Sequence, residues 1–331
     1  MSALELGQRA GGRGAGLALA LLSAATFGTS GTFASALIGA GWTSAAAVTA
    51  RITLAALVLT PFAIAQLRGQ WHLLVRSAGL VGAFGLVPVA ACQLFYFNAV
   101  SHLSVGVALL LEYLGTVLVV GWMWARHGRR PRRLTVAGAG AAILGLVFVI
   151  NLTGSQRLDP VGVLWGLGAA VGLAMYFVLS ARTDSQLPPL VFAWSGMCVG
   201  AAALLIMGAV HALPMRAPRV QVTLFHHHVS WLAPVLGLAL VAAAFAYIAG
   251  ISAARLLGPT LSSFVGLTEV LFAVGFSWLA LGQVPTAMQA LGGGFIVAGV
   301  ILVRVDELRR SQDGEKVASR EAPVDAAPLT L

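Results

Sequence analysis

Long apolar stretches separated by short polar segments dominate the chain. Each stretch has about 17–25 residues, the length that an α-helix needs to cross the hydrocarbon core of a bilayer. The pattern predicts an all-α integral membrane protein with ten transmembrane helices. They lie near residues 15–38, 44–66, 77–100, 104–125, 134–151, 161–181, 189–211, 230–252, 260–281 and 286–304.

The composition supports this reading. The chain is 59% hydrophobic and only 9% charged, with a mean hydropathy of +0.90, whereas a soluble domain has about 25% charged residues. The net charge of +9 could suggest a nucleic-acid partner. However, the charges lie in short loops and in the two ends of the chain, with no basic face, so nucleic acid is excluded. The lipid bilayer is the expected surrounding.

The basic residues predict the orientation in the membrane. With the N-terminus in the cytoplasm, the predicted inner segments carry 16 Lys and Arg residues and the outer segments carry 3, while Arg51 lies within a span. Cytoplasmic loops of membrane proteins carry an excess of Lys and Arg. We therefore expect a multi-pass protein of the inner membrane with both termini in the cytoplasm.

An internal repeat relates the two halves of the chain. Residues 104–124 and 258–278 align when they are shifted by 154 positions, and the register continues through the following helix. A repeat of this kind predicts a duplicated architecture. The aligned pairs include Gly121 and Gly275, Trp124 and Trp278, Pro131 and Pro285, Gly138 and Gly292, Gly140 and Gly294, and Gly145 and Gly299.

Five helices in each repeat would make the two copies cross the membrane in opposite directions. The loop before Pro131 (A-R-H-G-R-R-P) is rich in arginine, whereas the equivalent loop before Pro285 (A-L-G-Q-V-P) has none. An inverted repeat is typical of secondary transporters. We expect a cytoplasmic N-terminal tail (1–14), a first five-helix repeat (15–151), a second one (161–304) and a disordered cytoplasmic tail (305–331).

The first apolar stretch has an alternative interpretation. It follows two arginines and contains small residues at 34–36, features that a cleaved signal peptide shares. We favour a retained helix because its removal would leave five predicted helices in one repeat against four in the other.

The sequence resembles a known family of transporters. The run E-Y-L-G-T-V-L-V-V begins at Glu112, and the second half has S-S-F-V-G-L-T-E-V-L-F-A-V, L-G-Q-V-P-T and Q-A-L-G-G-G-F-I-V-A-G-V-I-L-V. These runs are similar to the EamA family of the drug/metabolite transporter superfamily. The resemblance implies ten helices and the export or exchange of small metabolites such as amino acids and their derivatives. It also implies a central cavity lined by the first four helices of each repeat, with the fifth and tenth helices peripheral.

Three charged residues lie well inside predicted spans. Arg51, Glu112 and Glu269 are costly to insert, about 2.5–3.5 kcal/mol each at a helix centre, and such residues mark substrate or ion pathways. Arg51 and Glu112 lie at similar depth toward the outer side. Arg51 could attract a substrate carboxylate, an interpretation that the resemblance favours, or it could be a structural arginine that pairs with a helix end or extends outward to the membrane surface. Arg51 and Glu112 could also form a structural pair with each other.

Glu269 lies near the predicted midplane of the membrane. Burial without a partner favours the neutral, protonated form of a carboxylic acid, so Glu269 is the candidate for coupling transport to a proton gradient. The alternative is a structural glutamate that is hydrogen-bonded to Thr268, Ser262 or the backbone.

Other polar and aromatic side chains could line the same cavity. Ser262 shares a helix face with Glu269, and three polar residues interrupt the third apolar stretch. Aromatic residues in spans are often packing residues or interfacial anchors, which is the competing interpretation. The candidates are Ser262, Gln93, Tyr96, Asn98, Tyr113, Trp165, Tyr176 and Tyr247.

No cofactor or metal is expected. Cys92 and Cys198 lie in apolar runs, where cysteine behaves as a small hydrophobe. The adjacent histidines 226–228 cannot all reach one ion from regular structure. The chain has no H-E-x-x-H, G-x-S-x-G or P-loop motif, which argues against a membrane enzyme and an ATP-driven pump. We predict a secondary transporter with a small-molecule substrate. The alternative is a non-transporting scaffold or accessory subunit, and the oligomeric state stays open.

Overall fold

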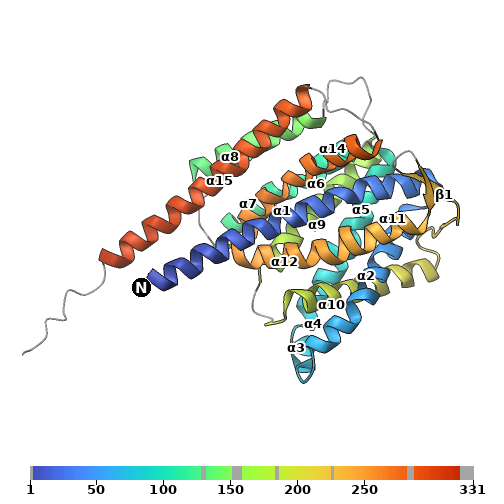
Figure 1. Cartoon of the computed structure of the whole chain (residues 1–331), viewed down its shortest axis with the longest axis horizontal. Helices are drawn as coiled ribbons and strands as arrows, with labels where there is room; N and C mark the ends of the chain where they lie inside the picture. Colours follow the sequence, from blue (N-terminus) through green and yellow to red (C-terminus); the bar gives the residue numbers. More distant parts are fainter. Residues whose placement is uncertain are drawn as a thin grey trace, which may run out of the picture.

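The chain folds into a bundle of helices that run roughly side by side, shown as a computed structural model in Figure 1. The structure describes residues 3–103, 105–127, 132–150, 159–182, 186–224, 227–281 and 287–320. The helices of the first repeat are α1 (Ala3–Gly39), α2 (Ser44–Gln66), α3 (Trp71–Arg76), α4 (Ala78–Phe84), the π-helix η1 (Gly85–Ala91), α5 (Cys92–His102), α6 (Val105–Tyr113), α7 (Gly115–His127) and α8 (Arg133–Ile150).

The second repeat has nearly the same order of helices and also contains two short strands. Its elements are α9 (Pro160–Ser180), α10 (Pro189–Ala209), β1 (Gln221–Leu224), β2 (His227–Ser230), α11 (Leu232–Leu236), the π-helix η2 (Gly237–Phe245), α12 (Ala246–Leu257), α13 (Pro259–Gly266), α14 (Thr268–Leu281) and α15 (Ala287–Arg320).

Seven helices in the described part of the chain are long and apolar enough to cross a membrane. They are Gly14–Gly39, Ser44–Gln66, Ala78–His102, Pro160–Ser180, Pro189–Ala209, Leu232–Leu257 and Pro259–Phe276. Two shorter apolar helices, Arg133–Gly145 and Ala290–Val303, lie in the fifth and tenth predicted stretches. The protein is therefore a multi-pass membrane protein, and the predicted number of ten depends on these shorter helices and on the broken segment formed by α6 and α7.

The structure corrects the all-α prediction in one segment. β1 and β2 form an antiparallel hairpin in which Val222 pairs with Val229. The segment Q-V-T-L alternates polar and apolar residues, and its two apolar side chains are buried while the other two are exposed, which is the pattern of a half-buried strand. His228 lies on β2 with its side chain exposed, and His226 is outside the described residues.

Helices extend into both predicted tails. α1 begins at Ala3, inside the predicted polar tail, and α15 continues to Arg320, so residues 305–320 are helical rather than disordered. This segment contains Glu, Arg, Lys and Gln, which have high helix propensity. The rest of the predicted tail, 321–331, lies outside the described residues.

Both repeats contain the same irregularities in their backbones. The π-helix η1 ends at Ala91 and η2 ends at Phe245, which are equivalent positions in the repeat. The two apolar segments that the sequence predicts as single helices, 104–125 and 260–281, are both interrupted, at Leu114 and at Leu267. In the alignment of the repeats, the positions of these two interruptions differ by only one residue, so the duplication extends to local backbone geometry.

The fifth and tenth helices, α8 and α15, pack against each other at one side of the bundle (Figure 1). Gly138 approaches Gly299, and Gly145 approaches Gly292, so the two helices run antiparallel. In the alignment of the repeats, Gly138 is equivalent to Gly292 and Gly145 to Gly299, so each contact joins a residue of one aligned pair to a residue of the other. A two-fold axis between the repeats would require this exchange. A β-carbon at Gly145 would lie 2.5 Å from the carbonyl oxygen of Gly292, which explains why glycine is needed.

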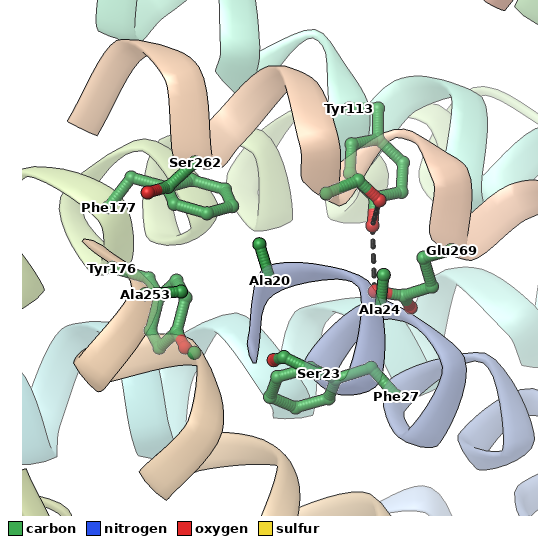
Figure 2. Close-up of a pocket in the computed structure, with 12 residues that line it drawn as sticks. Ala20, Ser23, Ala24, Phe27, Tyr113, Tyr176, Phe177, Ala253, Ser262 and Glu269 are labelled. Carbon is green, nitrogen blue, oxygen red and sulfur yellow. Dashed lines mark hydrogen bonds between the residues drawn. The ribbon is translucent and has the colours of Figure 1, made fainter. Parts of the chain in front are cut away.

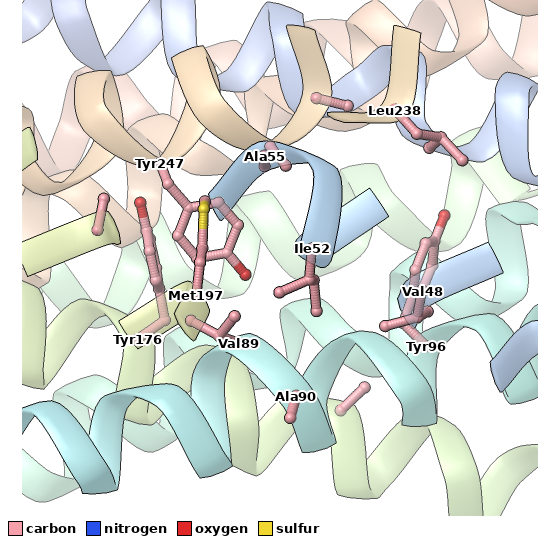
Figure 3. Packing of buried hydrophobic residues seen from close by; sticks show 14 of the residues in the cluster. Val48, Ile52, Ala55, Val89, Ala90, Tyr96, Tyr176, Met197, Leu238 and Tyr247 are labelled. Carbon is pink, nitrogen blue, oxygen red and sulfur yellow. The ribbon is translucent and has the colours of Figure 1, made fainter. Parts of the chain in front are cut away.

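The core lies between the two repeats. Figure 3 shows buried side chains from α2, η1, α5, α9, α10, η2 and α12 meeting at the centre of the bundle. Large apolar residues also cover the outside: Leu57, Leu164 and Leu279 are 63%, 70% and 70% exposed. Such extensive apolar exposure suits a surface that faces lipid rather than water.

Candidate functional site

A small cavity lies at the interface between the repeats. It is enclosed by α1, α6, α9, α12, α13 and α14 and has a volume of about 30 Å³, enough for about two water molecules. Figure 2 shows the side chains around it. Its lining consists of Ala20, Ser23, Ala24, Phe27, Tyr113, Tyr176, Phe177, Gly250, Ala253, Ser262, Gly266 and Glu269.

Four of the residues predicted from the sequence meet at this cavity: Tyr113, Tyr176, Ser262 and Glu269. The hydroxyl oxygen of Tyr113 lies 2.7 Å from Oε2 of Glu269, the contact marked by the dashed line in Figure 2, and 2.8 Å from the carbonyl oxygen of Gly266. Tyr113 comes from the first repeat and the other two residues from the second. The contact therefore joins the two halves of the chain at the cavity wall.

The interruption between α13 and α14 places Gly266 in this position. In a continuous helix, the carbonyl of Gly266 would accept from the N–H of Val270, four residues later. Here the Val270 N–H instead donates to Leu267 at 3.2 Å, and the Leu267 N–H donates to Phe264 at 3.1 Å. The Gly266 carbonyl is thereby left for a side chain, and Tyr113 supplies the donor.

Ser262 brings a hydroxyl group to the cavity from α13. Its side chain is 3% exposed, and Oγ makes no hydrogen bond with any residue that the structure describes. A buried hydroxyl without a partner is uncommon. The cavity beside it has room for a water molecule or for a polar group of a ligand.

One face of α1 completes the lining. Ala20, Ser23, Ala24 and Phe27 are spaced so that they share one side of the helix. Ser23 donates to the carbonyl of Ala246 at 2.9 Å. This face was not predicted from the sequence, although a hydroxyl group and small residues at helical spacing within an apolar stretch are a signal that could locate it.

Tyr247 lies next to the cavity without lining it. Its ring centroid is 5.2 Å from that of Phe27 and 5.5 Å from that of Tyr176. Its hydroxyl donates to the carbonyl of Pro88, in η1, at 3.4 Å. The three rings therefore form a packed wall behind the cavity.

Arg51 is held by neutral groups from three other elements. Its guanidinium donates to Ser30 on α1 at 3.1 Å, to Oε1 of Gln93 on α5, and to the carbonyl of Ala242 in η2. The side chain is 1% exposed, and its carbon Cζ lies 5.9 Å from the ring centroid of Phe27. The predicted polar residue Gln93 is thus a ligand of Arg51.

Glu112 does not take part in the hydrogen bonds of Arg51. Its carboxyl oxygen Oε1 lies 3.6 Å from the thiol of Cys92, which also lies 3.4 Å from the carbonyl of Ala169. Glu112 is buried outside the cavity lining. Of the two interpretations that the sequence left open for Arg51 and Glu112, the direct pair is not formed among the described residues.

Three other predicted residues lie apart from the cavity lining. Trp165 packs against Phe95, with ring centroids 5.2 Å apart. Tyr96 is buried beside Phe97. The backbone carbonyl of Asn98 accepts from Ser101 at 2.7 Å. None of these three residues is part of the lining of this cavity.

Comparisons with known proteins agree with this architecture. Residues 14–151 and 160–305 each match the model of the EamA-like transporter family. A protein of Streptantibioticus cattleyicolor, named a probable terminal-alkyne amino-acid exporter, is 26% identical over 247 residues, which cover 74% of this chain and 79% of that protein. An uncharacterized transporter of Clostridium kluyveri is 22% identical over 271 residues, or 80% of this chain and 84% of that protein.

A solved crystal structure has the same fold. It superposes with a TM-score of 0.68 and 18% sequence identity, and the match covers 88% of this chain and 97% of that one. The fold is therefore shared over almost the full length of both chains.

Proposed function

Because the chain belongs to the EamA-like transporter family, we propose that it is a secondary transporter that exports or exchanges small metabolites, amino acids or their derivatives, across the inner membrane. The observation that carries the proposal is the cavity between the repeats, where Tyr113 of one repeat meets Glu269 of the other. Ligand sites of repeat-built transporters lie at such an interface near the bilayer midplane.

The proposed topology has ten spans, with the two repeats inverted and both termini in the cytoplasm. The antiparallel contact of α8 with α15 supports it, since these helices are equivalent in the repeat. The excess of Lys and Arg in the inner loops supports the orientation. In this topology the cavity extends from the midplane, where Glu269 lies, toward the cytoplasmic side along α1, α12 and α13, and Arg51 lies toward the outer side.

Arg51 is proposed to attract the carboxylate of the substrate. Its hydrogen-bond partners among the described residues are all neutral, so none of these residues balances its positive charge by direct contact, and a buried charge is stabilised strongly by an opposite one. The name of the relative from Streptantibioticus cattleyicolor, an amino-acid exporter, agrees with a carboxylate substrate.

The transport cycle is proposed to be one of alternating access. The cavity of about 30 Å³ between the repeats would have to widen to admit an amino acid. The packed rings of Phe27, Tyr176 and Tyr247 would separate to admit the substrate. Glu269 would bind and release a proton in the same cycle, which would couple export to the proton gradient.

Counterflow in proteoliposomes tests this function. A panel of amino acids, aromatic analogues and cationic drugs is screened with and without a pH gradient. We expect exchange of a carboxylate substrate, and a loss of roughly 30-fold or more in Arg51→Met, the size expected when one partner of a buried charge pair is removed. Arg68→Ala, at an exposed position after α2, is the matched control and keeps the wild-type rate.

If folded protein transports no compound of the panel, the alternative of a scaffold or accessory subunit is favoured. Exchange that is equally fast in Arg51→Met would refute the role of Arg51 in substrate binding and leave transport itself intact.

A further inference from the structure

The hydroxyl group of Tyr113 has two oxygen neighbours and one proton. It lies 2.8 Å from the carbonyl oxygen of Gly266 and 2.7 Å from Oε2 of Glu269. The backbone carbonyl can only accept a hydrogen bond. If Tyr113 donates to Gly266, the second contact is a hydrogen bond only when the carboxyl group of Glu269 donates to the Tyr113 oxygen. Both contacts are therefore satisfied when Glu269 carries a proton.

Loss of that proton changes which of the two oxygen atoms Tyr113 prefers to donate to. A hydrogen bond to an ionised carboxylate is roughly twice as strong as one between neutral groups. The Tyr113 hydroxyl would therefore turn its single proton to Glu269, and the Gly266 carbonyl would lose its donor. Gly266 is half-buried and lines the cavity. A carbonyl that is shielded from bulk water and has no partner is costly, so a new donor would be favoured.

An alternative donor lies in the same chain segment. The N–H of Val270 is the helical partner of the Gly266 carbonyl and is now bonded to Leu267 at 3.2 Å. A transfer of this N–H from Leu267 to Gly266 would restore the regular α-helical bond across the interruption. Deprotonation of Glu269 would thus straighten α13 and α14 into a more continuous helix.

We propose that Tyr113 is a positioning residue that links the proton on Glu269 to the shape of the α13–α14 interruption. With the proton present, Tyr113 holds the Gly266 carbonyl and the helix stays interrupted; with the proton gone, Tyr113 turns to the carboxylate and the helix straightens. Ser262 and Glu269 lie on either side of the interruption and both line the cavity, so straightening would change the cavity wall. The inference rests on the proposed function, in which Glu269 exchanges a proton during transport.

Other ionisable groups act on Glu269 from the elements around it, in addition to Tyr113. They are Glu112 on α6, Tyr176 on α9, Cys92 and Tyr96 on α5, and Arg51 on α2. The face of α1 that lines the cavity contributes only Ala20, Ser23, Ala24 and Phe27, none of which ionises. Arg51 has the opposite charge to an ionised Glu269, whereas Glu112 has the same charge when it is itself ionised.

Distances between two spin labels across the interruption test the inference in the full-length protein. The labels are placed at Thr260 on α13 and at Leu279 on α14, which is 70% exposed, in a Cys198→Ser background. We expect the distance to change between acidic and alkaline pH by roughly 1–2 Å, the size of common helix shifts. A control pair at Val161 and Val171, both on the uninterrupted helix α9, should not change.

Two variants separate this switch from a general effect of pH. Glutamine in Glu269→Gln can donate to Tyr113 as a protonated acid does, so it should keep the acidic distance at every pH. Tyr113→Phe cannot hold the Gly266 carbonyl, so it should keep the alkaline distance at every pH. A purely structural role of Tyr113 would not produce this pair of results, in which Glu269→Gln keeps the acidic distance and Tyr113→Phe keeps the alkaline one.

An unchanged distance in the wild-type protein overturns the inference, as does a wild-type response in Tyr113→Phe or the alkaline distance in Glu269→Gln. If Tyr113→Phe does not fold, the wild-type protein and Glu269→Gln still decide the question. No substrate is needed for these distances. Normal counterflow without a distance change would support the proposed function and refute the switch. A distance change without counterflow would support the switch and refute the proposed function.

Discussion

The first repeat has a buried carboxylic acid, Glu112, at the position where the second repeat has Gly266. The second repeat has Glu269 where the first has Gly115. A β-carbon at Gly115 would lie 2.5 Å from the carbonyl oxygen of Ala170 on α9, so no side chain fits there. The two repeats share their backbone geometry, but their packing against α9 permits an acid at a different position in each.

The same contrast holds at the two π-helices. The carbonyls of Pro88 in η1 and Ala242 in η2 occupy equivalent positions, and each accepts a hydrogen bond from a side chain of the other repeat. The donor to Ala242 is the cation Arg51, whereas the donor to Pro88 is the neutral hydroxyl of Tyr247. π-helical segments are frequent at functional sites. Here a symmetric pair of them carries asymmetric chemistry, which suits a transporter whose two sides perform different steps.

The largest effect is expected where the symmetry is closest, at the contact between α8 and α15. In Gly145→Leu and Gly299→Leu the new side chain meets backbone atoms, at 2.5 Å and 2.6 Å from its β-carbon. We expect both variants to lower the free energy of unfolding by similar amounts, about 1–3 kcal/mol or more, as overpacking of a core does. The yield of monodisperse protein and its melting temperature measure them.

The repeat supplies matched controls for this prediction. Gly140 and Gly294 are equivalent positions on the same two helices, and a β-carbon at either has no neighbour within 4 Å. Leucine at these positions should leave the melting temperature within a few degrees of wild type. Equal losses in all four variants would contradict the contact as the cause.

An intermediate effect is expected from the two acids. Glu269→Gln should abolish the acceleration of counterflow by a pH gradient, because glutamine cannot release a proton, while exchange without a gradient continues. Glu112→Gln should lose less of this acceleration, since Glu112 lies outside the cavity lining and contacts the thiol of Cys92. Rates with and without the gradient in the two variants provide the comparison. If the gradient still accelerates Glu269→Gln fully, the proton-coupling role of Glu269 is wrong.

The sequence predicted the parts of this fold that depend on composition and periodicity. Apolar length located most of the helices, and the alignment of Gly138 and Gly145 with Gly292 and Gly299 identified the repeat before their contacts were known. The cost of burying a charged side chain identified Glu269 as a candidate, because an isolated charge in an apolar stretch usually marks a functional site. These signals are local or repeated along the chain.

The parts that could not be predicted depend on contacts between distant segments. Nothing in the local sequence indicates that Tyr113 reaches Gly266 and Glu269, more than 150 positions away, or that Arg51 is held by Ser30, Gln93 and the carbonyl of Ala242. The interruption at Leu267 was not predicted, because an apolar pattern continues through it and a carbonyl that lacks its usual helical donor leaves no trace in the sequence.

The smallest effect is expected from Tyr247→Phe, which removes the donor to Pro88 and keeps the aromatic ring. The bond is long, 3.4 Å, so its loss should cost at most about 0.5–1 kcal/mol, the lower part of the range for a neutral hydrogen bond. The ring still packs against Phe27 and Tyr176. Thermal unfolding should therefore show a small shift and counterflow a rate close to wild type. If Tyr247→Phe instead lost transport to the same degree as Arg51→Met, the two carbonyl contacts would be functionally equivalent, and the asymmetry between the repeats would have to lie in the acids alone.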